Sequence, residues 1–261
     1  MSSHSSTTPA VTDPLPHSPG KGQLISPPGE PGNAVSIRRA GLTAGIALLV
    51  LAALSAIGVL VAVDGLVTPG DAAKTAANIT AAETRFRLGV ASLYLVVVLD
   101  IIAAWALFRF FAPVHPWLSR LTAWLRVAYS GVFLAAISQL AAVPALLNDP
   151  GHQAMFGEQQ LQAHAMLKLE AFHHTWMAAL LLFGAHLALL GYLAYRSGYV
   201  PRLVSVALVI AGAGYAFDTF SSVLSADPIV ISTYTALGEL VLAIWLVMRG
   251  GRIHLGAGHD A

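Results

Sequence analysis

Cysteine is absent from this chain, and charged residues fill only 10% of its 261 positions. Without a thiol there is no disulfide, no thiolate nucleophile and no cysteine-bound metal. A soluble domain of this length needs more charge than this to cover its surface. The formal net charge of +1 argues against a broad electrostatic attraction to nucleic acid, so we expect no nucleic-acid partner. No motif indicates a metal or a cofactor, and we expect neither.

Apolar residues dominate instead, at 56% of the chain with a mean hydropathy of +0.70. About 20 helical residues cross the ~30 Å hydrocarbon core of a bilayer. The runs lack the alternation of a barrel strand, so helices are the expected element. We predict an all-α polytopic membrane protein, a bundle of six transmembrane helices within residues 35–250. The six predicted spans are Arg39–Val63, Phe86–Phe111, Leu118–Leu147, Thr175–Tyr195, Leu203–Leu224 and Ile229–Met248.

The two ends of the chain differ in composition from the bundle. Residues 1–34 are rich in Ser, Pro, Gly and Thr and predict a disordered cytoplasmic N-terminal tail. Residues 251–261 are expected to form a short cytoplasmic C-terminal tail. The orientation follows from the positive-inside rule, and it places the protein in the cell membrane with both termini in the cytoplasm. The Lys and Arg residues on the N-terminal side are Lys21, Arg38, Arg39, Arg109, Arg120, Arg196, Arg202, Arg249 and Arg252.

Local signals add detail to this architecture. Asp71 follows a Pro-Gly turn and is expected to cap a short helix running through Ala76. Pro144 is expected to end or kink the third span. Residues 156–174 carry apolar side chains at helical spacing. They predict either an amphipathic helix on the outer membrane surface that continues into the fourth span, or a long solvated start of that span. The aromatic side chains expected in the interfacial belts are Trp105, Trp117, Trp124, Trp176 and Tyr192.

Several short motifs resemble one family when they are taken in order. They are Arg39-Ala40-Gly41-Leu42, Val67-Thr68-Pro69-Gly70-Asp71, Phe86-Arg87-Leu88-Gly89 before Asp100, Gly184-Ala185-His186, Tyr195-Arg196-Ser197-Gly198-Tyr199-Val200-Pro201-Arg202, Gly214-Tyr215 with Asp218, and Gly238-Glu239-Leu240. Together they resemble the bacterial six-span membrane proteins grouped as domain-of-unknown-function family 4386. The resemblance covers roughly residues 39–250 and implies the architecture, but it implies no reaction.

Polar residues inside the spans are the candidates for function, because an ionisable group in the membrane is costly unless it is paired or hydrated. Position along each span places Asp100, Arg126 and His186 in one layer toward the cytoplasmic half. We predict that Asp100 and Arg126 are partners on consecutive antiparallel spans. Glu239 is expected near the middle of the last span, and Asp218 in the outer half of the fifth.

The predicted site lies inside the bundle and opens to the outer face. Asp218 and Glu239 are its expected acidic residues, and Arg87, His173 and His174 are expected around its outer mouth. Two carboxylates on consecutive spans without a local Lys or Arg need water, a cation, a proton or a basic group from another span. These residues indicate a small-molecule or ion binding or transport protein with an unidentified ligand.

Three alternatives stay open on the sequence alone. A structural or accessory membrane protein without chemistry fits the short loops and small-residue faces such as Gly41-x-x-x-Gly45 and Gly184-x-x-x-Ala188. Besides the lipid bilayer, a second copy of the chain is an expected candidate partner, as a homo-oligomer. A metal-dependent intramembrane hydrolase would need His173, His174 and Asp218 to converge with a further ligand. A haem protein would need a histidine opposite His173 or His186 on another span, and no other span contains one.

Overall fold

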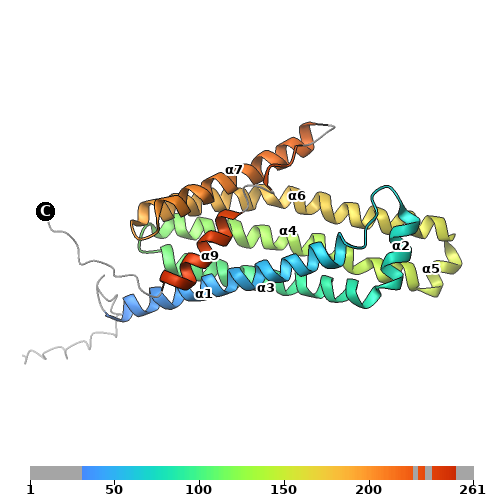
Figure 1. Ribbon diagram of the computed structural model, residues 1–261, viewed down its shortest axis with the longest axis horizontal. Coiled ribbons are helices and arrows are strands. Elements are labelled where there is room, and N and C mark those ends of the chain that lie inside the picture. The colour runs from blue at the N-terminus through green and yellow to red at the C-terminus, as the bar shows by residue number, and fades with distance from the viewer. Residues whose placement is uncertain (1–30, 226–228, 233–236, 251–261) are drawn as a thin grey trace, which may run out of the picture.

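The computed structural model describes residues 31–225, 229–232 and 237–250, and these residues form helices and no strand (Figure 1). The predicted all-α class is therefore confirmed. Most of both predicted tails lies outside the described residues. The helices are α1 (Pro31–Ala56), the π-helical turn η1 (Ile57–Val63), α2 (Ala72–Ala81), α3 (Glu83–Phe111), α4 (Pro116–Asn148), α5 (Pro150–Met155), α6 (Glu158–Ser197), α7 (Arg202–Leu224) and α9 (Leu237–Arg249).

Five helices are long and apolar enough to cross a membrane. They cover Ser36–Val61, Glu83–Phe111, Pro116–Asn148, Glu158–Ser197 and Arg202–Leu224. These five agree with the first five predicted spans. The sixth predicted span is only partly described, since residues 233–236 fall outside the description and α9 has 13 residues. At about 1.5 Å per residue, α9 alone is about 20 Å long, less than the bilayer core.

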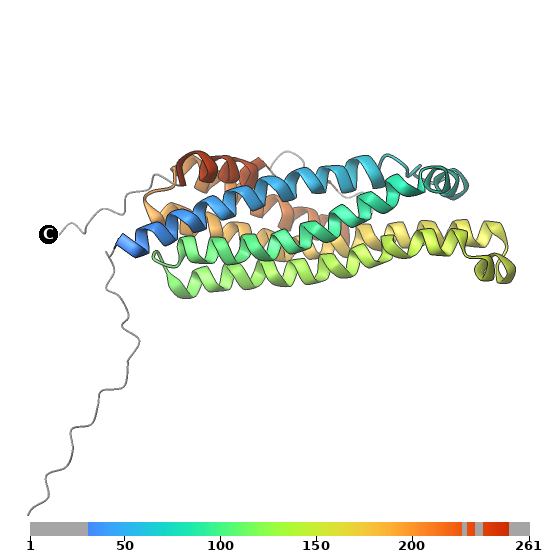
Figure 2. The same cartoon turned by 90° about the horizontal axis from the view of Figure 1, so that it is seen from below.

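Short connections make the long helices antiparallel neighbours. α3 and α4 are joined by residues 112–115, where the ring of His115 accepts a hydrogen bond from the Leu118 N–H and caps α4. The main helix pairs are α1 with α3, α3 with α4, α4 with α6, and α6 with α7, while α9 lies against α1 and α7 (Figures 1 and 2). Buried apolar side chains, such as Phe86, Ile137 and Leu190, fill the spaces between them.

Glycines allow several of these contacts to be close. A Cβ atom at Gly212 of α7 would lie 2.5 Å from the Gly184 carbonyl oxygen of α6, and one at Gly238 would lie 2.5 Å from the Ala207 carbonyl oxygen. Gly41 of α1 faces Phe110, and Gly45 faces α9. The small-residue faces recognised in the sequence are therefore used for packing within the chain.

We call one end of the bundle the arginine end. The helices α1, α4 and α7 start at this end, and the helices α3, α6 and α9 end there (Figure 1). Every described Asp and Glu lies more than two helical turns away from these helix ends. The described residues at this end of the bundle are therefore rich in arginine and include no Asp or Glu. Its basic residues are Arg38, Arg39, Arg109, Arg120, Arg196, Arg202 and Arg249.

The opposite end extends beyond the length of a bilayer. α6 has 40 residues and is about 60 Å long, roughly twice the hydrocarbon thickness. Its first half packs against α4 and α2, burying Leu161, Ala165, Leu169 and Phe172. The predicted apolar face is therefore present on this segment. Both interpretations from the sequence expected lipid or water against it, whereas neighbouring helices of the same chain cover it.

Two local predictions can be compared with the structure at this end. Asp71 caps α2 as expected, since its carboxylate accepts a hydrogen bond from the Lys74 N–H at 2.8 Å, and the helix continues to Ala81. Pro144 does not end α4, which continues for another turn to Asn148.

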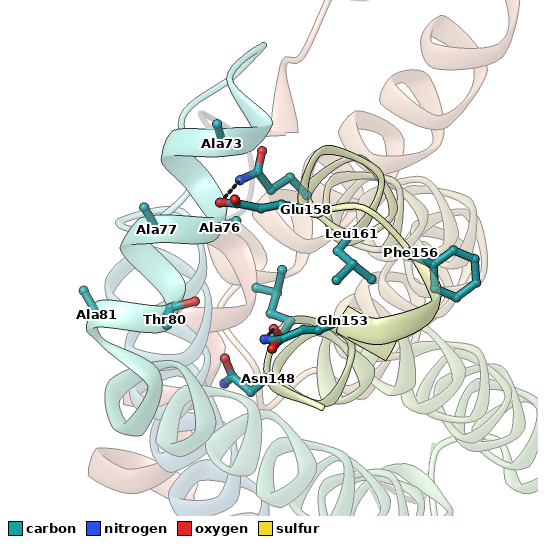
Figure 3. A pocket seen from close by; sticks show the side chains of 12 residues that line it. Ala73, Ala76, Ala77, Thr80, Ala81, Asn148, Gln153, Phe156, Glu158 and Leu161 are labelled. Carbon is teal, nitrogen blue, oxygen red and sulfur yellow. Dashed lines mark hydrogen bonds between the residues drawn. The ribbon is translucent and has the colours of Figure 1, made fainter. Parts of the chain in front are cut away.

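A groove separates α2 from α5 and the start of α6 (Figure 3). Its volume is about 840 Å³. Alanines of α2 and the polar side chains of Asn148, Gln153, Glu158 and Gln162 line it. Gln162 donates a hydrogen bond to Glu158 at 3.0 Å across one turn of α6. The groove lies at the start of α6, far along this helix from the buried polar residues.

Candidate functional site

Four polar residues from four helices lie in one layer of the bundle. Asp100 and Arg126 are each about three turns from the arginine end, one before the end of α3 and the other after the start of α4. His186 lies about three turns before the end of α6, and Glu239 about three turns before the end of α9. Each is therefore about 15 Å from the arginine end, close to half the ~30 Å hydrocarbon thickness.

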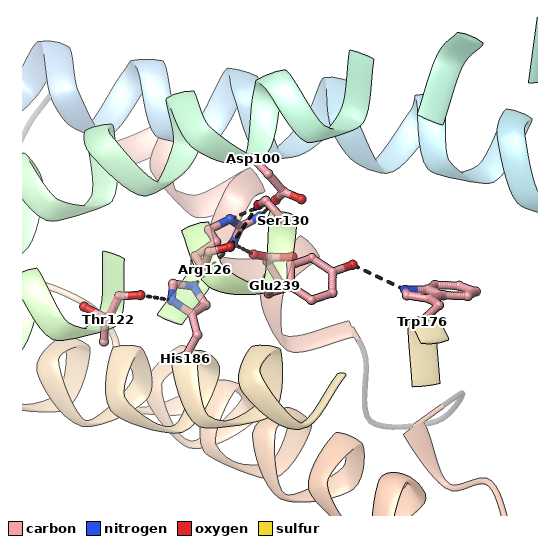
Figure 4. A network of polar contacts seen from close by, with 8 residues as sticks. Asp100, Thr122, Arg126, Ser130, Trp176, His186 and Glu239 are labelled. Atoms are coloured by element: carbon pink, nitrogen blue, oxygen red, sulfur yellow. Dashed lines mark hydrogen bonds and ion pairs between the residues drawn. The ribbon is translucent and has the colours of Figure 1, made fainter. Parts of the chain in front are cut away.

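Arg126 is the centre of this layer and is completely buried. Its Nε and Nη2 donate to Oδ1 of Asp100 at 2.9 and 2.6 Å, and its Nη1 donates to Oε1 of Glu239 (Figure 4). The predicted contact between Asp100 and Arg126 is confirmed. Glu239 is a second anionic partner of this arginine, which counting residues along the last span does not reveal.

His186 completes the layer and is held from both sides of its ring. Its Nδ1 is 2.8 Å from the carbonyl oxygen of Thr122, and its Nε2 is 3.3 Å from Nη1 of Arg126. A carbonyl can only accept, so Nδ1 carries the proton and Nε2 accepts from the arginine. His186 is therefore a neutral, fully hydrogen-bonded side chain in this arrangement. The prediction that Asp100, Arg126 and His186 share one layer is confirmed, and the position of that layer toward the cytoplasmic side stays a prediction.

The charges of this cluster do not balance. One guanidinium faces two carboxylates, and His186 contributes no charge. Among the described residues, Oδ2 of Asp100 receives no hydrogen bond, although the side chain is only 3% exposed. Buried carboxylate oxygens normally have a donor, so the cluster has the acceptor capacity for a proton, a water molecule or a small cation.

An aromatic cluster lies beside the arginine between α4 and α6. The Phe183 ring is centred 5.3 Å from Cζ of Arg126, and it stacks on His186 and packs against Tyr129. The Tyr129 hydroxyl accepts a hydrogen bond from Nε1 of Trp176 at 3.3 Å (Figure 4). Trp176, expected in an interfacial belt, thus directs its indole N–H into the bundle. Helical spacing could have revealed this cluster, since Tyr129 and Phe183 are each three residues from a member of the charged layer.

Asp218 lies outside this cluster. Its two carboxylate oxygens accept hydrogen bonds from the backbone N–H groups of Ile231 and Ser232, at 2.8 and 2.9 Å. It lies more than four turns after the start of α7, about 24 Å from the arginine end, whereas Glu239 is about 15 Å from it. The structure therefore does not bring the two predicted acidic residues together.

The three residues predicted around the outer mouth are exposed. Arg87 pairs with Glu83 one turn earlier in α3 at 2.6 Å, and the rings of His173 and His174 lie 6.0 Å apart on α6. Partial desolvation raises the pKa of Asp64, and the nearby His173 lowers this pKa to a smaller extent. Within the described ranges, none of the three makes a hydrogen bond or ion pair with Asp218 or Glu239.

A metal-dependent hydrolase would require at least three ligands in one place. Over the residues that the structure describes, no three His, Asp or Glu side chains form a group that could hold a metal ion. His173, His174 and Asp218, which such an enzyme would need together, do not converge. The cluster around Arg126 is therefore the better candidate site.

The five apolar helices and the charged layer between them define a multi-pass membrane protein. The chain belongs to the family described as "Domain of unknown function (DUF4386)", whose model matches residues 43–250. An uncharacterized protein of Archaeoglobus fulgidus is 29% identical over 164 residues, covering 63% of this chain and 85% of the relative. A similar sequence therefore occurs in an archaeon. No solved structure matches the chain.

Proposed function

We propose that this protein is a transport-type membrane protein that binds a proton or a small cation at the cluster of Asp100, Arg126, His186 and Glu239. One observation carries the proposal: a buried arginine holds two carboxylates in mid-bundle, which leaves one negative charge in excess. A proton or a monovalent cation would restore neutrality. Intramembrane ionisable residues that face the bundle interior are typical of ion and proton pathways.

Within the cluster, Glu239 is the residue that would take up and release the proton. Its side chain is 15% exposed, whereas those of Asp100 and Arg126 are 3% and 0% exposed. It also belongs to α9, a short helix that packs mainly on α1 and α7. Asp100 belongs to the long helix α3 and accepts two of the arginine N–H groups. Asp100 would therefore hold Arg126 in place while Glu239 gains or releases a proton.

The sixth span is part of the same proposal. Ile231 and Ser232 are bonded to Asp218, about 24 Å from the arginine end, while α9 ends at Arg249 within that end. Residues 229–249 would thus cover most of the hydrocarbon thickness, with non-helical backbone at 229–231. Non-helical backbone at membrane depth is typical of transporter binding sites, where protein or a polar cavity surrounds it. Six crossings would put both termini on the cytoplasmic side.

The proposed topology predicts opposite locations for two reporter fusions. A phosphatase, which is active only outside the cytoplasm, should be active when inserted at Gly151, between α4 and α6, and inactive at the C-terminus. A fluorescent protein that folds only in the cytoplasm should behave in the opposite way, because six crossings return the chain to its starting side. Phosphatase and fluorescent-protein reporters measure the two locations, and activity on the same side for both fusions would contradict six spans.

Replacing Glu239 by glutamine should remove proton binding without unfolding the protein. On acidification, infrared difference spectra of the wild-type protein in liposomes should contain a carboxyl band that is missing from the spectra of Glu239→Gln. Asp218→Asn is the matched control, because the Asp218 carboxylate is already held by two backbone donors and should contribute no such change. An unchanged carboxyl signal in Glu239→Gln would contradict the proposed role.

A structural role is the second candidate, and the glycine contacts favour it. The backbones of α6 and α7 approach closely at Gly184 and Gly212, and the charged cluster joins α3, α4, α6 and α9. Interhelical bonds of this kind hold many bundles together without taking part in any chemistry. If Glu239→Gln lowers stability but removes no acid-induced carboxyl band of the wild type, this second function is the correct one.

A further inference from the structure

We propose that the arginine end carries a specific site for an anionic phospholipid, formed where the start of α1 meets the end of α3. Its polar residues are Ser36, Arg39 and Arg109, and Trp105 lies beneath them. This proposal is independent of the charged cluster in the middle of the bundle. It follows from the charge, the exposed aromatic side chain and the apolar faces at this position.

The guanidinium of Arg109 is held in place but not neutralised. Its Nη2 donates to Oγ of Ser36 at 3.0 Å, which links α3 to α1. Its Cζ lies 6.0 Å from the centre of the Trp105 ring, within the range of a cation–π contact. Arg109 is exposed, and no carboxylate of the described residues pairs with it. Arginine presents its donors in a planar fork that fits a phosphate.

Arg39 supplies the second charge. It is exposed and lies one turn after Ser36, so the two side chains share one face of α1. Ser36 accepts the hydrogen bond from Arg109, and Arg39 therefore lies one turn from the Arg109 guanidinium. No Asp or Glu is described at this end of the bundle to compete for either arginine.

Apolar side chains continue from both arginines toward the middle of the bundle. On α1, Leu42, Ile46 and Val50 repeat at helical spacing below Arg39 and are 42%, 49% and 42% exposed. On α3, Trp105 is 58% exposed and Val98 is 54% exposed, two turns apart on one face. α1 and α3 pack against each other (Figure 2), so the two stripes belong to neighbouring helices.

This combination selects a lipid rather than a soluble anion. Arginines clustered at the membrane surface attract a phosphate headgroup, and the apolar stripes below them would contact the acyl chains. Trp105 lies one turn below Arg109, and an exposed tryptophan near the end of a span is typical of a membrane interface. A free phosphate would contact only the arginines, whereas one phospholipid would contact the arginines and both stripes.

The test measures lipid-dependent thermal stability of the full-length protein in detergent. Phosphatidylglycerol should raise the melting temperature, while phosphatidylcholine and inorganic phosphate should not. The double variant Arg39→Gln, Arg109→Gln should need at least about tenfold more phosphatidylglycerol than the wild type to reach half of the maximal rise in melting temperature. Arg109→Lys should have an intermediate sensitivity to phosphatidylglycerol, because lysine retains the positive charge but lacks the planar fork of donors.

Arg120→Gln is the matched control, since Arg120 is exposed at the same end but on α4, away from Ser36. It should respond to phosphatidylglycerol like the wild type. An equal loss in Arg120→Gln would show a diffuse charge effect and overturn the proposed site. An equal response to phosphatidylcholine, or a response to inorganic phosphate alone, would overturn it as well.

Discussion

Replacing Arg126 by leucine is expected to destabilise the folded protein by about 3–5 kcal/mol, the range typical of breaking a buried ion pair from one side. The change removes the donor of three hydrogen bonds to carboxylates and leaves Asp100 and Glu239 facing each other in the bundle. The free energy of unfolding can be measured by denaturant titration in mixed micelles. Arg120→Leu on the same helix is the control, and because its side chain is exposed it should change stability little.

The partners of Arg126 predict an order among further variants. Asp100→Leu should lower the free energy of unfolding less than Arg126→Leu does, because Glu239 still pairs with the arginine. The double variant Asp100→Leu, Arg126→Leu should regain only part of the stability lost in Arg126→Leu, since Glu239 is then unpaired. The triple variant that also carries Glu239→Gln should regain more of this stability. If the single changes at Asp100 and Arg126 are both harmless, the ion pair does not stabilise the bundle.

Replacing Gly212 by alanine is expected to destabilise the protein by about 1–3 kcal/mol, the usual cost of overpacking a close contact. The new Cβ atom would lie 2.5 Å from the Gly184 carbonyl oxygen and 2.8 Å from the Ala188 nitrogen. Both atoms belong to the backbone of α6 and cannot rotate away, so α6 and α7 would have to separate. The same titration in mixed micelles measures the change.

Gly131→Ala on α4 provides the matched control for this substitution. A Cβ atom there would meet no atom within 4 Å, so the substitution changes helix propensity alone. Alanine is the better helix former by about 0.8–1.0 kcal/mol, and Gly131→Ala should be neutral or stabilising. Equal destabilisation by both changes would mean that the α6–α7 contact is not the cause.

The membrane class, the first five spans and the layer of Asp100, Arg126 and His186 were all accessible from the sequence. Depth in a membrane helix depends on residue count, because the rise per residue is constant and the span ends are marked by arginines and turns. Counting inward from those ends places three residues on three helices at one level, and the structure joins them with hydrogen bonds. The cap at Asp71 was also accessible, since capping depends only on neighbouring residues.

Only the tertiary structure decided which partners the other two candidate acids have. Glu239 and Asp218 are both acids inside apolar segments, yet one binds Arg126 and the other binds backbone N–H groups of residues 231–232. Residue counting gives depth along a helix but not the rotation of the helix or the identity of its neighbours. Those depend on how small residues such as Gly184 and Gly212 let particular helices approach. The first half of α6 is a second example. The sequence alone determined that this segment has an apolar face, whereas the packing of α2 and α4 decided what covers that face.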